Sequence, residues 1–279
     1  MCMGFGCNAV GVTGCRIIDS KRERLIAILT NAFVPCNGRF PTLLALIAMF
    51  FSVGTGVGAS ALSALILSLL IVFCIAVTLG VSWLLSKTFC RGKPSSFLLE
   101  LPPYRRPQIG KVIVRSILDR TLHVLGRAAA VAAPAGLILW ILGNVQTDGI
   151  PLLSGFAGAL DGIGHFFGMD GVILLAFLLA LPANEIIVPI MLMIYSSGGV
   201  ITTYSSLSDL QATLTANGWT IVTAVCVTVF LLFHWPCSTT LWTIGKETGK
   251  ARYVLLSALL PTAVGLTLCA LIRAVSLLF

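Results

Sequence analysis

Three cysteines and one glutamate are the residues of this chain whose types and positions best suit chemistry. Cys7, Cys36 and Cys237 each lie where glycine or proline interrupts an apolar stretch, and Glu185 follows a proline between two apolar runs. Thiolates select transition metals over Na⁺, Mg²⁺ and Ca²⁺, and helix ends and the cation itself favour the thiolate form. The pattern predicts a mixed sulfur and oxygen site for a transition metal ion.

Each of these residues also has a purely structural interpretation. A free cysteine packs as a small apolar residue as often as it reacts, and a protonated glutamate can hydrogen-bond a neighbouring helix. The metal interpretation is favoured because all three cysteines coincide with breaks. An acid at membrane depth, moreover, normally marks an ion path or a proton relay. The other six cysteines stand singly, and no CxxC spacing suggests a zinc cage or a disulfide framework.

The composition indicates an integral membrane protein. Of the 279 residues, 57% are hydrophobic and only 10% are charged, whereas soluble domains carry about 25% charged residues. The net charge of +8 does not indicate nucleic-acid binding, because the basic residues cluster in 20–24, 87–127 and 246–252 and are absent between Arg127 and Lys246. Such clusters mark the cytoplasmic ends of membrane spans.

The helices that position the candidate residues must be broken at membrane depth. Proline and glycine free backbone carbonyls, which must then face protein or a wet cavity. The breaks form two similar sets, one with Cys7-Asn8 and Pro35-Cys36 and one with Asn184-Glu185 and Pro236-Cys237. Paired interruptions of this kind indicate a transporter built from two repeats, with its site at their interface. Asn8 and Asn184 are expected to support the site from just outside it.

The predicted fold is an all-α polytopic membrane helix bundle with two inverted gate-type repeats containing broken helices. The sequence divides into a first gate repeat (1–54), a transmembrane helix (55–90), a basic cytoplasmic and amphipathic segment (91–127), a transmembrane helix with an interfacial segment (128–170), a second gate repeat (171–250) and a C-terminal transmembrane helix (251–279).

Two features of the second half leave alternatives open. Residues 150–168 carry Asp161 and His165 one helical turn apart, which suits a polar turn or interfacial helix, or else a role in ion entry. Whether this segment crosses the membrane decides the direction of every later helix. His123 and His234 flank apolar stretches and are interpreted as interfacial residues rather than ligands.

Four motifs, in order along the chain, resemble the bacterial ferrous iron transporter B family. "GFGCN" (4–8) followed by "PCNGRFP" (35–41) resembles its first gate region, and "ELPPYRRP" (100–107) resembles its cytoplasmic motif. "LPANEIIVP" (181–189) and "WPCSTTLWTIGKETG" (235–249) resemble its second gate region. The resemblance covers essentially the whole chain and implies Fe²⁺ import across the bacterial inner membrane, with Cys7, Cys36, Glu185 and Cys237 on the ion path.

The resemblance also implies partner proteins, and it implies that segments usual in the family are missing from this chain. Family members normally carry an N-terminal GTP-binding domain and a span or more before "GFGCN", so the chain is expected to be a fragment, a split gene product or a truncated relative. A separate GTP-binding domain or a small accessory protein is therefore an expected partner, besides Fe²⁺ and membrane lipids, and a homo-oligomer is an open alternative. No nucleic acid is expected as a partner and no cofactor or metal is expected to be retained.

Other functions remain as alternatives. An organic-solute carrier of the nucleoside type also uses paired gate regions, but its site would favour aromatic, Asn and Gln side chains over three cysteines. A non-transporting remnant is the third alternative. An enzyme is not expected, because "TIGKETG" (243–249) lacks the first glycine and the Ser/Thr of a phosphate loop, and no HExxH or GxSxG occurs.

Overall fold

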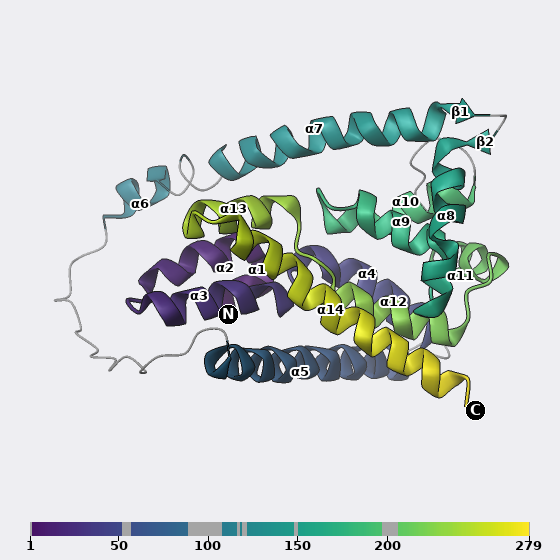
Figure 1. The fold of residues 1–279 in the computed structure, drawn as a ribbon, viewed down its shortest axis with the longest axis horizontal. Helices are drawn as coiled ribbons and strands as arrows, with labels where there is room; N and C mark the ends of the chain where they lie inside the picture. The colour runs from purple at the N-terminus through teal and green to yellow at the C-terminus, as the bar shows by residue number, and fades with distance from the viewer. Residues whose placement is uncertain are drawn as a thin grey trace.

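The chain folds into an all-α bundle whose long helices run in roughly one direction (Figure 1). A computed structural model describes residues 2–51, 57–88, 108–115, 118, 122–147, 150–196 and 206–278. The helices are α1 (Cys2–Gly6), α2 (Asn8–Gly14), α3 (Lys21–Thr30), α4 (Phe40–Phe50), α5 (Val57–Lys87), α6 (Ile109–Arg115), α7 (His123–Asn144), α8 (Leu152–Phe166), α9 (Gly171–Leu179), α10 (Ile187–Tyr195), α11 (Leu207–Ala216), α12 (Ile221–Phe233), α13 (Ser238–Thr248) and α14 (Ala251–Ser276).

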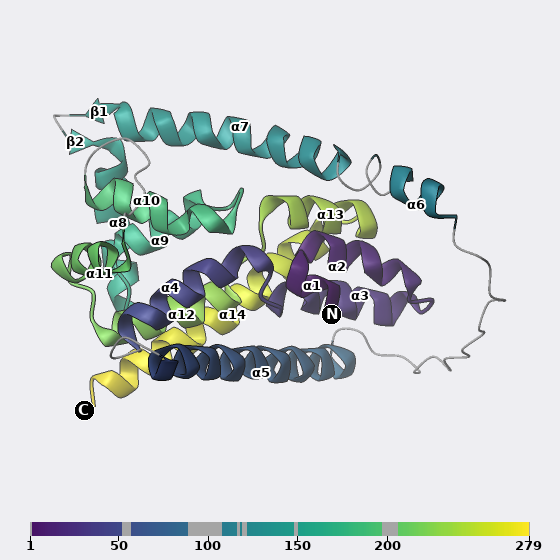
Figure 2. The same ribbon diagram turned by 180° about the vertical axis from the view of Figure 1, so that it is seen from behind.

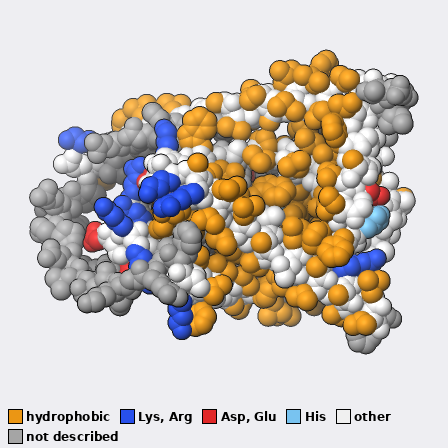
Figure 3. All heavy atoms as spheres, viewed as in Figure 1, with side chains coloured by type: hydrophobic (Ala, Val, Ile, Leu, Met, Phe, Trp, Pro, Cys, Tyr) orange, Lys and Arg blue, Asp and Glu red, His pale blue; other side chains and the backbone are white. Residues whose placement is uncertain are grey.

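Four stretches are long and apolar enough to cross a membrane. They are Lys21–Phe50, Gly58–Lys87, Ile221–Thr248 and Ala251–Ser276, of 26 to 30 residues each. The first joins α3 to α4 and the third joins α12 to α13, so two of the four are interrupted helices. Hydrophobic side chains cover most of the visible face (Figure 3), as lipid contact requires. The chain is therefore a multi-pass membrane protein.

The charged residues lie at the two ends of this apolar face. Lys and Arg side chains gather at one end in Figure 3, where the start of α3, the end of α5 and the start of α14 lie. The positive-inside pattern predicts that this end faces the cytoplasm, and it is called the cytoplasmic end below. The "ELPPYRRP" motif and most of the basic segment 91–127 lie outside the described residues, and α6 is the described part of that segment. Helix α7 begins at His123, earlier than the predicted position near 128.

Helix α8 settles the direction of the second half. It follows a short antiparallel pair of strands, β1 (Gln146–Thr147) and β2 (Ile150–Pro151), and lies across the direction of α5 and α7 in both Figure 1 and Figure 2. It meets α9 at a bend of 110°. Segment 150–168 therefore lies along the non-cytoplasmic end, and α9 and α10 both approach the middle of the bundle from that end.

The bend between α8 and α9 rests on a close backbone contact at Gly171. A Cβ atom there would lie 1.9 Å from the Ala157 carbonyl oxygen, so only glycine fits. Asp161 Oδ1 accepts a hydrogen bond from the Gly171 amide at 2.9 Å, and Asp170 caps α9 through the Ile173 amide at 2.6 Å. These acids stabilise the start of a half-helix, which is a structural role.

The two interrupted spans run in opposite directions and lie against each other. Helices α2 and α13 are in contact on the cytoplasmic side, and α4 and α12 are in contact on the other side (Figures 1 and 2). The backbone of Cys7 before α2 (φ −152°, ψ 125°) matches that of Ala183 before the 3₁₀ turn Asn184–Ile186 (φ −151°, ψ 123°). Both residues are extended and directly precede a helical turn, and each is followed by an asparagine, Asn8 or Asn184. The predicted pairing of Cys7-Asn8 with Asn184-Glu185 stays a prediction.

Candidate metal path at the helix breaks

Four helical segments begin in the middle of the bundle, each after one of the breaks. Cys7 precedes α2, Cys36 precedes the 3₁₀ turn Asn37–Arg39 that leads into α4, and Cys237 precedes α13. The Asn37–Arg39 turn contacts the Asn184–Ile186 turn that leads into α10. The Ser238 amide donates to the Leu181 carbonyl at 2.9 Å, which ties the start of α13 to the end of α9. Both halves of the chain therefore contribute to one region.

The structure brings three of the predicted site residues together. The side-chain amide nitrogen of Asn184 lies 3.9 Å from Cys36 Sγ. Cys237 lies close enough to Cys36 and to Cys7 for charges on the thiols to interact. The Cys237 thiol also contacts Thr240 Oγ1 at 3.2 Å. All three cysteines are free of disulfides and are neither fully buried nor fully exposed.

Glu185 contacts the first half of the chain at Gly38. A Cβ on Gly38 would lie 2.8 Å from Glu185 Oε1, so the carboxylate rests against a backbone that carries no side chain. The apolar runs on either side of Glu185 predicted an enclosed acid, but its side chain is exposed. The reason is that the 3₁₀ turn at 184–186 turns Asn184 inward and Glu185 outward.

The ligands are not gathered in a closed cage. Among the described residues, no group of three or more His, Cys, Asp or Glu side chains is placed to hold a metal ion. The assignment of Cys7, Cys36, Glu185 and Cys237 as metal ligands therefore stays a prediction. The geometry adds that any coordination in this conformation would be incomplete, with thiols from both repeats facing a common region.

Arg39 is a buried residue that the sequence interpretation missed. Its guanidinium is fully buried and donates to the carbonyl oxygens of Leu232 (2.7 Å), His234 (3.2 Å) and Trp235 (3.4 Å). These are carbonyls that the break after α12 leaves without helical partners. Arg39 thus supplies donors from the first repeat to the broken backbone of the second, as membrane burial demands. A basic residue four positions after Pro35, between two apolar runs, was the available signal.

His234 is a second residue whose position differs from the sequence interpretation. It was interpreted as interfacial, but it is 1% exposed and lies among the aromatic rings of Phe177, Phe230 and Trp235. Its Nε2 lies 3.1 Å from Asn184 Oδ1. The break turns the chain inward immediately after α12, which places this ring beside the predicted site. The side chain of His123 lies outside the described part of the structure.

The glycines around Cys7 and Asn8 are explained by Asn31. A Cβ at Gly11 would lie 2.5 Å from Asn31 Oδ1, and one at Gly4 would lie 2.7 Å from the same atom. Asn31 is buried and its amide donates to the Asn8 carbonyl at 2.9 Å. The glycines let α1 and α2 approach this amide, which fixes the backbone beside Cys7.

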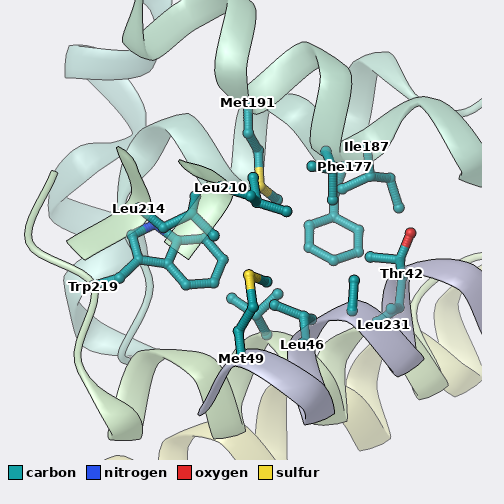
Figure 4. A pocket seen from close by; sticks show the side chains of 13 residues that line it. Thr42, Leu46, Met49, Phe177, Ile187, Met191, Leu210, Leu214, Trp219 and Leu231 are labelled. Atoms are coloured by element: carbon teal, nitrogen blue, oxygen red, sulfur yellow. The ribbon is translucent and has the colours of Figure 1, made fainter. Parts of the chain in front are cut away.

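Beyond the breaks, on the non-cytoplasmic side, the bundle is packed with apolar side chains. Figure 4 shows a cavity of about 10 Å³ between residues of α4, α9, α10, α11 and α12 and the nearby Trp219, including Leu46, Met49, Phe177 and Met191. A space of this size holds about one water-sized probe. The cavity is therefore too small and too apolar to hold a hydrated ion in this conformation.

Outside the candidate spans, Cys15 behaves as a packing residue. Burial raises the pKa of its thiol, and Sγ donates to the Gly11 carbonyl at 3.3 Å. Its neighbour Arg16 forms a bidentate pair with Glu247 of α13, with Nη2 to Oε1 at 2.6 Å. This pair links the two repeats at the cytoplasmic end.

Comparisons with known proteins agree with the motifs. The family model described as "Ferrous iron transport protein B C terminus" matches residues 67–119. The protein named "Fe(2+) transporter FeoB" of Staphylococcus aureus (strain MSSA476) is 30% identical over 272 residues, which cover 94% of this chain and 38% of that relative. A protein of the same name from Methanocaldococcus jannaschii is 24% identical, over 89% of this chain and 37% of the relative.

A further relative carries a fused neighbour. The "Fe(2+) transport protein A/Fe(2+) transporter FeoB fusion protein" of Porphyromonas gingivalis is 23% identical over 99% of this chain and 37% of the relative. No solved structure matches the chain. The chain spans less than two fifths of the length of these relatives. Over nearly its whole length the chain is similar to proteins of the ferrous iron transport protein B family, in agreement with its four motifs.

Proposed function

We propose that this chain is the ion-conducting membrane part of an Fe²⁺ importer of the bacterial inner membrane. The observation that carries the proposal is the meeting of the breaks: the Asn184 side chain lies 3.9 Å from Cys36 Sγ, and Cys237 lies within electrostatic reach of both Cys36 and Cys7. Sulfur with a few oxygen donors suits a transition metal and disfavours Na⁺, Mg²⁺ and Ca²⁺. The similarity to proteins named Fe(2+) transporters supports iron as the cargo.

The arrangement suggests how an ion is taken up and released. The exposed Glu185 carboxylate attracts a cation to the break region, where the cation meets the thiols. Metal binding releases the thiol protons, so binding and deprotonation occur together. Iron ranks below copper and zinc in intrinsic affinity, so selectivity rests on weak, incomplete coordination and on which ion is available. Weak binding also allows the ion to leave.

We propose that a partner protein controls Fe²⁺ transport by this chain. The fused relative from P. gingivalis joins the transporter to a protein named Fe(2+) transport protein A, which supports a small accessory protein as a partner here. A separate GTP-binding domain is the second proposed partner, docking on the basic segment 87–127, whose charge suits an acidic surface.

The chain alone is expected not to hydrolyse GTP or ATP, because it carries no phosphate-cradling loop. Phosphate release from GTP by the purified 279-residue chain measures this directly, with buffer and a known GTPase as references. Sustained turnover that follows the chain through purification would contradict the expectation.

The transport proposal is tested in proteoliposomes with radiolabelled Fe²⁺ under anaerobic conditions. Cys36→Ser and Cys237→Ser are expected to lower uptake by about tenfold or more, the loss typical of a disturbed metal site. Cys2→Ser, which changes an exposed thiol elsewhere, is the matched control and should leave uptake unchanged. Uptake of labelled nucleoside instead of iron would support an organic-solute carrier. Uptake of neither would support a non-transporting remnant.

A further inference from the structure

The contacts of His234 determine how the Asn184 amide faces the break region. The ring nitrogen Nδ1 lies 2.9 Å from the Leu231 carbonyl oxygen, which can only accept, so Nδ1 carries a hydrogen and donates. The other ring nitrogen, Nε2, lies 3.1 Å from the Asn184 side-chain position assigned as Oδ1. With an oxygen at that position, the ring would have to donate from both nitrogens and be a cation.

A cationic His234 is unfavourable at this position. The ring is 1% exposed, and its own backbone carbonyl accepts from the buried guanidinium of Arg39 at 3.2 Å. A second positive charge here would be buried beside the first, and no ion pair of His234 with a carboxylate is found in the described part of the chain. An unpaired buried charge is strongly disfavoured. The ring is therefore neutral, with a bare Nε2 that must accept a hydrogen bond.

The neutral ring requires the Asn184 amide to be turned end for end. The two ends of a side-chain amide are nearly the same size, and their assignment follows from the hydrogen bonds around them. In the turned orientation Nδ2 donates to His234 Nε2, and the carbonyl oxygen takes the position 3.9 Å from Cys36 Sγ. This contact is at the long limit for a hydrogen bond to sulfur, and the thiol loses its hydrogen when it binds a metal, which leaves the oxygen able to bind the same ion.

The side-chain nitrogen of Asn8, in the first repeat, is also held by hydrogen bonds to acceptors inside the protein. Turned in the same way, the Asn8 amide donates to the Val34 carbonyl at 3.2 Å and the Gly4 carbonyl at 3.1 Å. In both repeats the amide nitrogen is then fixed by an internal acceptor.

We propose that His234 is a positioning residue that holds the Asn184 carbonyl oxygen toward Cys36, so that the amide acts as a metal ligand rather than as a support. The proposal rests on the proposed transport function. Metal ions bind sulfur at about 2.3 Å and oxygen at about 2.1 Å, so one ion spans atoms 3.9 Å apart with a bent S–metal–O angle. The oxygen makes the site harder and improves binding of ions such as Fe²⁺ and Mn²⁺ relative to soft Cd²⁺.

The test measures binding of Mn²⁺ and of Cd²⁺, each alone, to the detergent-solubilised full chain by calorimetry. His234→Phe removes the acceptor, Asn184→Ala removes the oxygen, and His234→Gln restores an acceptor oxygen on a different side chain. The ratio of the Mn²⁺ Kd to the Cd²⁺ Kd is expected to rise about tenfold in His234→Phe and in Asn184→Ala, as for other residues that orient ligands. The double variant should show no further rise, and His234→Gln should stay near the wild type.

The outcomes separate this inference from the proposed function. An unchanged ratio in His234→Phe, or additive effects in the double variant, would overturn the inference while wild-type binding and iron uptake leave the transport proposal intact. A wild type that binds neither ion would overturn both. If His234→Phe does not fold, the remaining pair decides: a raised ratio in Asn184→Ala with an unchanged ratio in His234→Gln supports the inference, and an unchanged ratio in Asn184→Ala overturns it.

Discussion

The carboxylate of Glu185 lies at the edge of the break region, where it can act on an ion before the thiols do. We expect Glu185→Gln to reduce Fe²⁺ uptake by about tenfold or more, because glutamine keeps the shape and removes the charge that attracts the cation. Uptake in proteoliposomes, normalised to the amount of inserted protein, gives the measurement.

Asp209→Asn provides the matched control for that loss. Asp209 is an exposed acid at the start of α11, at the non-cytoplasmic end and away from the breaks. Its replacement should leave uptake close to the wild-type rate. Equal rates for Glu185→Gln and the wild type would remove Glu185 from the ion path and leave it as a surface residue.

The glycines beside Cys7 act through packing rather than chemistry. Gly11→Ala places a Cβ 2.5 Å from the Asn31 side chain, which is buried and cannot move freely. Overpacking of this kind typically costs about 1–3 kcal/mol, so the melting temperature should fall. Gly6→Ala is the control, because nothing lies within 4 Å of its added Cβ. Similar melting temperatures for the two variants would show that the first repeat adapts around Asn31.

Which residues meet at the helix breaks could be predicted only in part. Cys36 and Cys237 were identifiable because each places a metal-binding thiol directly after a proline that interrupts an apolar run. His234 and Arg39 were not, because their roles depend on which carbonyls and amides the other repeat brings near, and that is a property of the tertiary structure. The exposure of Glu185 likewise depends on the turn at 184–186 and not on its apolar neighbours.

At the scale of helices, Arg39 stabilises the interrupted span of the second repeat by donating hydrogen bonds to its free carbonyls. Arg39→Met would leave the carbonyls of Leu232, His234 and Trp235 without these donors in an apolar interior. Each unsatisfied buried group costs about 1–3 kcal/mol, so a loss of about 3 kcal/mol or more is expected. Thermal unfolding in detergent measures it.

Arg16→Met is the comparison for this change. Arg16 pairs with Glu247, but its side chain is 69% exposed, and exposed ion pairs contribute about 0–1 kcal/mol. A small effect for Arg16→Met with a large one for Arg39→Met is the expected pattern. Comparable losses would mean that water or other groups replace the Arg39 donors at the break.

The breaks themselves were predictable, but the course of segment 150–168 was not. Proline and glycine mark an interruption whatever the surroundings, so the broken spans followed from the sequence. Helix α8 has the length and apolarity of a half-span, and only its contact with α9 at Gly171 shows that it lies across the bundle. The sequence signals such a close contact between two backbones only by a glycine. Because glycines are frequent in this chain, Gly171 could not be singled out from the sequence.

At the scale of the whole molecule, the charge distribution and the course of α8 together fix a topology. Lys21, Lys87 and Lys250 lie at the ends of helices that meet on one side of the apolar face, and His165 and the C-terminus lie on the other (Figures 1 and 3). Basic residues are retained in the cytoplasm, so His165 should lie outside. The topology therefore places α9 and α10 as a hairpin that enters and leaves from the outer side.

The topology is tested by cysteine labelling in intact cells. Compared with a Cys2→Ser background, which removes the cysteine that is exposed among the described residues, His165→Cys should show added reaction with a membrane-impermeant maleimide applied outside. Lys250→Cys should react only after the cells are permeabilised, because the start of α14 lies at the basic end. The side chain at His165 is 69% exposed, so its labelling depends on its side of the membrane and not on burial.

Labelling of Lys250→Cys in intact cells together with protection of His165→Cys would reverse the orientation. Protection of both would mean that α8 lies within the bilayer, and the hairpin assignment of α9 and α10 would then be wrong.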